Sequence, residues 1–312
     1  MKETTHPNDV APSVGGAVER GVNGAVVRAA GRVVGFFLWL GLWFFPSFGL
    51  QAQFTYTNLH GSLIITGYQG EPTSVRIPEA IDHLPVAGIG ARAFKDRTAL
   101  TDVTLPNSVT RIGNQAFDGC SGLTNVDWGH GVAFIGNLAF SGCVGLTSVT
   151  LPDSVQSIGR SAFFQCYGLT RVTIGKGVTG IEKSAFADCR SLTHVVFGDS
   201  VTTIGAFAFG SCSSLKSLVI TNSLTSIGPA AFSGCSGLTN AILGRDLVGI
   251  GNTAFGSCLE LTTITFLGNR PREPRNLFLH STPTVLYLPE TSGWGETFAG
   301  RPTRPWNRSA LP

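Results

Sequence analysis

The stretch AFSGCVGLTSVTLPDSVQSIG, residues 139–159, contains most of what decides the fold. Its middle part, Leu146 to Leu151, alternates apolar and polar side chains, which is the period of a β-strand with one buried face. Pro152 ends that strand, because proline cannot donate a hydrogen bond to a β-ladder. Val155 to Ile158 then forms a second short extended piece, and the following segment, residues 161–166, fits a tight helical turn.

The same pattern recurs every 23 residues. Four residue types form separate columns at this interval: Cys120, Cys143, Cys166, Cys189, Cys212, Cys235 and Cys258; Phe94 through Phe255; Leu100 through Leu261; and Ile89 through Ile250. One unit of this length cannot bury its own apolar side chains, whereas stacked units cover one another. The period therefore predicts a repeat solenoid of about eight rungs, each rung being one 23-residue unit.

The spacing of these columns resembles a known family. The Leu-x-x-Val-x-Leu core, with Cys three residues before the first Leu, resembles the leucine-rich repeat, and Ala-Phe-x-x-Cys-x-x-Leu with the Ile-Gly step resembles its BspA-like bacterial subclass. The match covers about residues 75–267, with departures at Arg97, which takes the first Cys position, at Glu182 and at Ala241. The resemblance implies a β-rich right-handed solenoid with a parallel sheet on one face. It also implies an extracellular or cell-surface protein used in adhesion or protein recognition, and no reaction.

The segments outside the repeats have separate predicted roles. Residues 1–52 are expected to be a leader with a signal peptide, because arginines precede an uncharged apolar core at 33–50 and a small residue, Ala52, offers a cleavage site. A retained membrane anchor is the alternative. In both cases the rest of the chain is exported, so we expect a secreted, periplasmic or cell-surface protein.

The remaining boundaries follow from where the period begins and ends. Residues 53–88 are predicted to form a β-hairpin cap and an imperfect first rung, residues 89–267 the repeats, and residues 268–312 an irregular C-terminal cap or tail. The aromatic residues Trp294, Phe298 and Trp306 favour sealing of that cap, although the same residue types could stack on a glycan.

Several classes of function find no support in the sequence. A net charge of +3 over 312 residues gives no reason to expect nucleic acid or an anionic membrane as a partner. The cysteines are odd in number and, in register, their Cβ atoms point the same way, so they suit a core ladder better than disulfides. No Cys-x-x-Cys pair suggests zinc, no cofactor is implied, and the six histidines lie far apart with no nucleophile and base nearby. We therefore expect a protein without catalytic or metal-binding residues.

Binding is expected on the outward side of the strands, where every second residue faces solvent. Val196, Val219 and Ile242 form an aliphatic stripe on this otherwise polar face, and such patches often mark contact sites. The candidate protein-binding face comprises Arg171, Thr173, His194, Val196, Ser217, Val219, Asn240 and Ile242. The leading hypothesis is a recognition or adhesion module for an extracellular or surface protein. The alternative is a structural envelope or matrix protein that self-associates through its edges, and an enzyme is a distant third.

Overall fold

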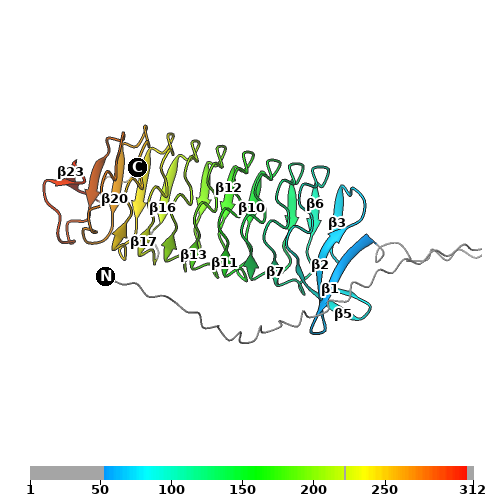
Figure 1. The fold of residues 1–312 in the computed structure, drawn as a ribbon. Coiled ribbons are helices and arrows are strands. Elements are labelled where there is room, and N and C mark those ends of the chain that lie inside the picture. Colours follow the sequence, from blue (N-terminus) through cyan, green and yellow to red (C-terminus); the bar gives the residue numbers. More distant parts are fainter. Residues whose placement is uncertain (1–52, 221–222, 308–312) are drawn as a thin grey trace, which may run out of the picture. The chain divides into compact units, whose positions relative to one another are not determined.

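The computed structural model describes residues 53–220 and 223–307, so the expected leader and its cleavage site lie outside the described residues. The described chain forms a stack of β-rungs that runs from the hairpin at residue 54 to the strands near residue 300 (Figure 1). No helix in these two ranges is long and apolar enough to cross a membrane.

One side of the stack is a continuous sheet of 11 strands, most of them only two residues long. In order along the stack these strands are β1 (Phe54–Leu59), β2 (Ser62–Tyr68), β5 (Leu84–Ile89), β7 (Arg111–Ile112), β9 (Phe134–Ile135), β11 (Ser157–Ile158), β13 (Gly180–Ile181), β15 (Thr203–Ile204), β17 (Ser226–Ile227) and β19 (Gly249–Ile250), with β4 (Ala80–Ile81) beside β5. From β5 onward the pairing is parallel and links residues 23 apart, such as Ile158 with Ile181.

The opposite side, which we call the strand face, carries the longer strands predicted from the alternating pattern. They are β3 (Ser74–Arg76), β6 (Asp102–Thr104) and β8 (Asn125–Asp127); β10 (Ser148–Thr150), β12 (Arg171–Thr173) and β14 (His194–Val196); and β16 (Ser217–Ile220), β18 (Asn240–Leu243), β20 (Thr263–Phe266), β21 (Thr284–Tyr287), β23 (Arg301–Pro305) and β22 (Thr297–Phe298). These groups form three separate sheets. The strands on this face are parallel, as the resemblance implied, but hydrogen bonding is interrupted between β8 and β10 and between β14 and β16.

A bulky core residue lies at each interruption. Trp128 and Phe197 follow β8 and β14 at a core position that most other rungs fill with Leu or Ile, although Phe266 occupies the same position in β20, which pairs with β21. The Trp128 ring packs edge-on against Phe140 at 5.2 Å, and the Phe197 ring against Phe209 at 5.7 Å. The inward valines of these two strands, Val126 and Val195, are only partly buried, whereas Val149 and Val172 are buried. Each interruption therefore coincides with a bulky core residue and a partly buried inward valine.

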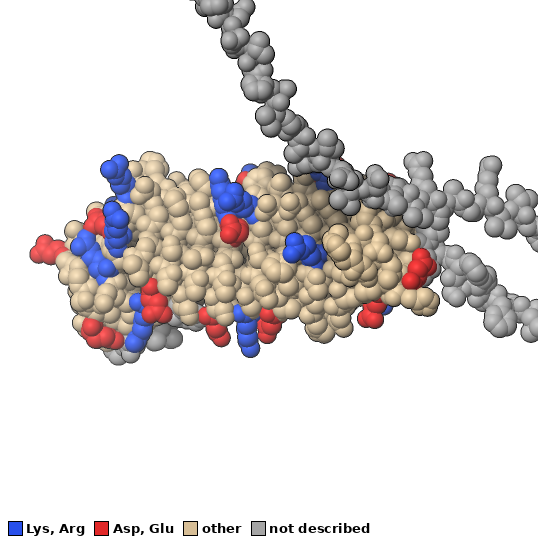
Figure 2. Space-filling model, turned by 60° about the horizontal axis from the view of Figure 1, so that its bottom comes forward, with Lys and Arg blue, Asp and Glu red and all other residues tan. Residues whose placement is uncertain are grey.

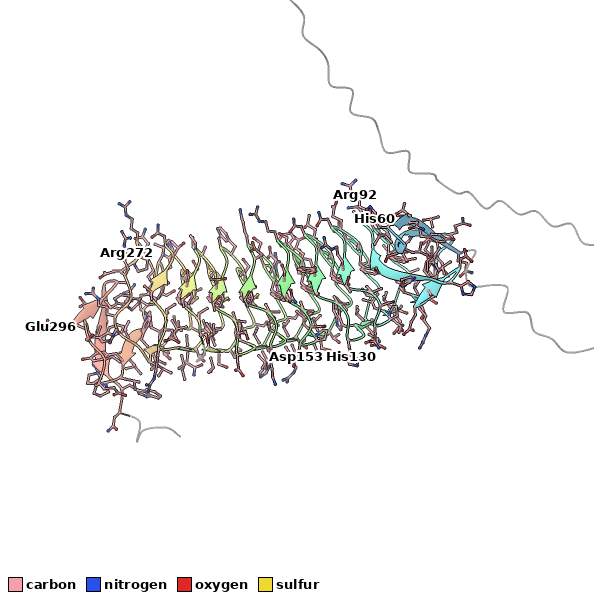
Figure 3. The ribbon with its side chains drawn as sticks, turned by 90° about the horizontal axis from the view of Figure 1, so that it is seen from below. His60, Arg92, His130, Asp153, Arg272 and Glu296 are labelled. Carbon is pink, nitrogen blue, oxygen red and sulfur yellow. The ribbon has the colours of Figure 1, made fainter. Side chains whose placement is uncertain are left out.

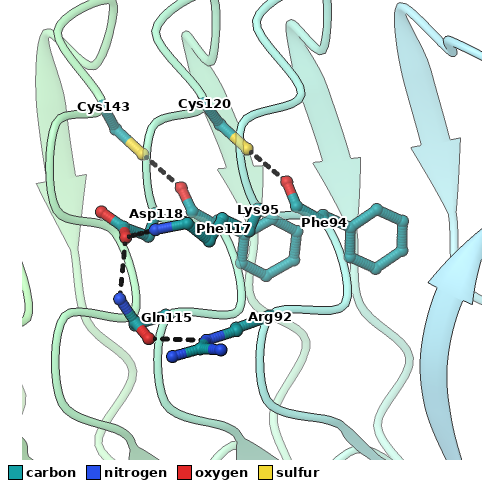
Figure 4. A network of polar contacts seen from close by, with 8 residues as sticks. All are labelled: Arg92, Phe94, Lys95, Gln115, Phe117, Asp118, Cys120 and Cys143. Carbon is teal, nitrogen blue, oxygen red and sulfur yellow. Dashed lines mark hydrogen bonds and ion pairs between the residues drawn. The ribbon is translucent and has the colours of Figure 1, made fainter.

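The core is a stack of identical side chains from successive rungs. From Phe94 to Phe255 the phenylalanine rings lie parallel, with centroids 5.1 to 5.4 Å apart. The seven cysteines beside them are buried free thiols, which confirms the core role predicted for them. Each Sγ donates to the carbonyl of the phenylalanine 26 residues earlier, at 3.0 Å for Cys120 and 3.2 Å for Cys143 (Figure 4).

The turn before each cysteine is not helical, in contrast to the prediction. Two residues in each turn, four positions apart, have positive φ; in one rung they are Ser161 at 54° and Gln165 at 58°. The same two columns repeat along the stack at 92, 115, 138, 161, 184, 207, 230 and 253 and at 96, 119, 142, 165, 188, 211, 234 and 257. A left-handed residue at each end of the segment prevents the run of right-handed residues that a helical turn requires.

The N-terminal end is closed as predicted by the antiparallel hairpin β1–β2. The extra residues of the first rung form a second small hairpin, β4–β5. Arg97, which occupies the first cysteine position, donates to the carbonyls of Tyr68 and Gly70 at 2.9 and 2.8 Å. Its guanidinium thereby ties the first complete rung to the cap.

The stacking extends past residue 267, the predicted end of the repeats. Phe278 and Ser281 lie 23 residues after Phe255 and Cys258, and β21 pairs in parallel with β20. The Ser281 hydroxyl donates to the Phe255 carbonyl at 2.9 Å, as the thiols do in earlier rungs. Trp294 and Phe298 then pack on Phe266 and seal the end. The core therefore runs without a gap from Phe54 to Phe298 and has its own cap at both ends, as an independently folding unit requires.

Candidate functional site

The candidate site lies on the strand face, where β12, β14, β16 and β18 present the predicted side chains. Alternation along each strand buries Val172, Leu218 and Ala241 and turns their neighbours outward. Six of the eight predicted residues are exposed, whereas Thr173 and Ile242 are partly buried: Arg171, His194, Val196, Ser217, Val219 and Asn240 form the exposed group. The strand period alone was enough to identify the outward side of these strands.

The aliphatic stripe is less uniform than the sequence suggested. Val196 and Val219 are each 51% exposed, which is high for valine on a polar face. Val196 pairs with Thr173 on its own sheet, and Val219 pairs with Ile242 on the next one. Because β14 and β16 are not hydrogen-bonded to each other, the two valines face solvent on either side of the interruption. The stripe is thus shared between two sheets and is not part of a single one.

A shallow groove of about 610 Å³ borders this stripe, and sequence reasoning did not identify it. Its strand side is formed by Thr150, Thr173 and Val196, and its other side by turn residues that follow the strands: His130, Asp153, Lys176 and Asp199. These four turn residues share one column of the repeat, and the only sequence signal for them was this spacing of 23 residues. Asp153 also holds its turn in place, since its Oδ1 accepts from the Lys176 backbone N–H at 2.9 Å.

Several charged or titratable side chains project from the long edges of the stack. His130 and Asp153 project from one edge, while Arg92 and Arg272 project from the opposite edge (Figure 3). Between the edges, the surface in Figure 2 is largely uncharged. At the N-terminal rungs the edge charges form a network, in which Lys95 pairs with Asp118, Gln115 donates to Asp118, and Arg92 donates to Gln115 at 2.9 Å (Figure 4). The Arg92–Gln115 and Lys95–Asp118 contacts join neighbouring rungs, which is a structural role.

The threonine column beside the first leucine of each rung is also structural. Its hydroxyls donate to the backbone carbonyl 23 residues earlier, for example from Thr170 to Thr147 at 2.9 Å and from Thr193 to Thr170 at 3.0 Å. The column therefore reinforces the stacking of the rungs. These hydrogen bonds give the threonine hydroxyls a structural role.

The described residues bring no catalytic group together. His194 contacts the Thr193 hydroxyl through Nδ1 at 2.8 Å, and Asp188 pairs with Arg190 at 3.2 Å. Burial raises the pKa of the Cys212 thiol from 9.0 to about 12, so this thiol stays protonated and is a poor nucleophile. Within residues 53–220 and 223–307, no three His, Cys, Asp or Glu residues are placed to hold a metal ion. Trp294 and Phe298 contribute to the cap, whereas Trp306 lines a separate shallow hollow with Pro289 and Pro305.

Comparison with known structures finds bacterial leucine-rich-repeat proteins. A leucine-rich-repeat protein of T. pallidum is 28% identical, covering 75% of this chain and 83% of its own, with a TM-score of 0.33. A leucine-rich cell-surface protein of Faecalibacterium prausnitzii is 23% identical over 74% of this chain and 86% of its own, with a TM-score of 0.43. A leucine-rich-repeat protein of Eubacterium ventriosum is 20% identical over 76% and 77%, with a TM-score of 0.46.

The search among curated proteins gave no match. The family model of the BspA-type leucine-rich-repeat region, in contrast, matches six copies over residues 87–216 and 202–290. This match agrees with the stacked rungs, the cysteine column and the extension of the repeats past residue 267. The chain belongs to the BspA-type leucine-rich-repeat family.

Proposed function

We propose that this protein is an exported recognition or adhesion module that binds an extracellular or surface protein on its strand face. The family is one of non-catalytic repeat scaffolds, which suggests a protein-interaction or surface module. Export is the expectation from the leader sequence at residues 1–52. The observation that carries the choice of face is the exposure of Val196 and Val219 beside the groove of about 610 Å³.

The physical reason for choosing this face is that exposed apolar surface costs free energy in water. Burying apolar surface stabilises a complex by roughly 25 cal/mol per Å². A valine pair flanked by Arg171, His194 and Thr173 combines an apolar centre with polar groups at its rim, which is the usual anatomy of a protein interface. The neighbouring groove widens the surface that a partner could contact.

The test is a capture experiment with residues 53–312 as bait and surface proteins as prey, read out by mass spectrometry. A second bait carries Val196→Lys, Val219→Lys and Ile242→Lys. A third, the matched control, carries Ser74→Lys, Asn125→Lys and Ser148→Lys, which add the same charge to the same face nearer the N-terminal end and away from the groove.

We expect to identify a partner that the unsubstituted bait and the control bait both capture and that the bait with the three substitutions in the aliphatic stripe does not. Truncation at the centre of an interface commonly costs more than about 1 kcal/mol per residue, so the loss of affinity should exceed about tenfold. Equal capture by all three baits would show that the partner binds elsewhere on the molecule.

A further inference from the structure

The N-terminal end of the long sheet presents an open strand edge. β1 is the outermost strand of the 11-stranded sheet, and within that sheet it pairs with β2 alone. Five of its six residues, Thr55 to Leu59, are exposed. The strand lies at the outer end of the stack in Figure 1.

The direction of the backbone groups on this edge follows from the hairpin. Leu59 and Ser62 close the two-residue turn His60–Gly61, whose φ values are both positive, and Gln69 N–H donates to the Gln53 carbonyl at 2.8 Å. Odd-numbered residues of β1 therefore bond across the hairpin, because hydrogen bonding alternates along an antiparallel strand. Phe54, Tyr56 and Asn58 direct their N–H and C=O groups away from β2.

The irregularity in the hairpin leaves this outer edge regular. The register shifts between Thr55, which pairs with Gly67, and Tyr56, which pairs with Ile65. The extra residue is thus Thr66, on β2. A bulge on the outer strand would twist the edge and hinder pairing, and β1 has none.

The side chains of β1 also lack the usual protection of an edge. Exposed edges are commonly blocked by charged residues or proline, and β1 contains neither. Tyr56 and Leu59 instead expose apolar surface, at 38% and 58%. The opposite end of the chain differs, because β23 contains Arg301, Pro302, Arg304 and Pro305, and β22, beyond it, is only two residues long.

We propose that a second copy of this chain pairs with β1 through its own β1, antiparallel, with Tyr56 on the two-fold axis. In this register Phe54 lies opposite Asn58 of the second copy, and all three outward-facing residues of each strand are used. The pairing forms roughly six N–H···O bonds, two for each hydrogen-bonded residue pair. Antiparallel pairing of identical strands is self-complementary, as a two-fold interface requires.

The chemistry favours a second copy and a closed dimer. An uncharged strand meets no like-charge repulsion from its own duplicate. Because the two-fold contact uses the same β1 edge of both chains, pairing at this edge ends with two chains and does not continue into a filament. This proposal is independent of the binding role of the strand face, which lies on another side of the rungs.

The first test measures mass by sedimentation equilibrium on residues 53–312, from about 1 µM to 1 mM. We expect the mass to rise toward twice that of one chain, with a dissociation constant of about 10 to 500 µM, because the contact is smaller than the interfaces of stable complexes. Tyr56→Lys and Tyr56→Glu, each alone, place like charges opposite one another and should weaken the dimer about tenfold. An equimolar mixture of the two variants should restore it.

The matched control is Tyr167→Lys, a similarly exposed tyrosine on a turn far from β1, and it should leave the dissociation constant unchanged. Recovery in the mixture separates loss of pairing from misfolding, since a misfolded chain would not regain a partner. A single-chain mass at 1 mM, an undiminished dimer in Tyr56→Lys, or no recovery in the mixture would each overturn the proposal.

The second test fixes the register by cross-linking. Thr55 and Thr57 of the second copy are opposite one another as a non-hydrogen-bonded pair, whose Cα separation of about 4.5 Å allows a disulfide. The seven native thiols are buried, so an added surface cysteine is the reactive one. Under mild oxidation a mixture of the Thr55→Cys and Thr57→Cys chains should form a covalent dimer faster than either chain alone, and faster than Ser148→Cys on the strand face. Equal rates in all samples would overturn the register.

Discussion

Two neighbouring rungs offer a reciprocal test of the strain in the left-handed turns. Gly142 and Gln165 occupy the same column of the repeat, with φ values of +69° and +58°. Glycine adopts this conformation without steric cost, whereas other residues lose about 1–2 kcal/mol in it. Replacing Gln165 by Gly removes that cost but adds roughly 0.5–1 kcal/mol of backbone entropy loss on folding. We therefore expect Gln165→Gly to raise the free energy of unfolding by about 0.5–1 kcal/mol.

The reverse change at Gly142 should lower the free energy of unfolding by a similar amount. A Cβ atom added there would meet nothing closer than the Gly119 Cα at 3.7 Å, an ordinary contact, so the cost is conformational. Gly145→Ala is a useful contrast, because its Cβ would lie 2.9 Å from the Leu123 and Ser121 carbonyl oxygens. That steric conflict should cost about 1–3 kcal/mol.

The measurement is urea-induced unfolding of residues 53–312 at 25 °C, followed by circular dichroism. The expected order of stability is Gln165→Gly, then the unsubstituted chain, then Gly142→Ala, then Gly145→Ala. If Gln165→Gly instead lowers the free energy of unfolding by about 1 kcal/mol, as a substitution to glycine does at an ordinary position, the argument that the turn is strained is refuted.

Three further predictions concern the core and the N-terminal cap. Phe163→Ala, which removes a ring stacked between Phe140 and Phe186, should lower the free energy of unfolding by about 3–5 kcal/mol in the same urea assay. Burial raises the pKa of the Cys212 thiol from 9.0 to about 12, so between these pH values only the unfolded chain loses this proton. The free energy of unfolding should therefore fall between about pH 9 and 12, and it should fall less in Cys212→Ala. Arg97→Ala, which removes the donors to two cap carbonyls, should cost about 1.5–3 kcal/mol, and hydrogen exchange should rise in β1 and β2 before the central rungs.

The features that could be predicted from sequence are those repeated in every rung. The columns of Phe, Cys, Leu and Ile specify which side chains are buried, and the alternation in each strand specifies which ones face solvent. Eight copies of one pattern make each assignment independent of any single residue. The hairpin cap was predicted from two strand-like stretches, residues 54–57 and 62–66, on either side of residues 58–61, which is likewise a short-range signal.

The features that escaped prediction depend on particular residues or on backbone conformation. The turn before each cysteine has a helix-like length, and nothing in residues such as Ser161, Gln165 or Thr253 indicates a positive φ. The last strand, at residues 284–289, was expected from sequence but was assigned to the cap, because it pairs Thr263 with Thr284 at an offset of 21 residues, which breaks the period that defined the other rungs. The groove was missed because its lining comes from turn residues of several rungs, which are brought together only by stacking.

The core and the candidate site are linked at Phe197. Its ring occupies a position that Ile or Leu fills in neighbouring rungs, and its bulk accompanies the loss of hydrogen bonding between β14 and β16. Val196, the residue before it, is exposed at that interruption and lines the groove together with Phe197. A regular rung would carry a smaller core residue and a continuous sheet at this point. Phe197, as a departure from the repeat, thus lies where the surface differs and where the aliphatic stripe is found. In a scaffold of nearly uniform rungs, such a substitution in the core makes one part of the strand face different from the rest.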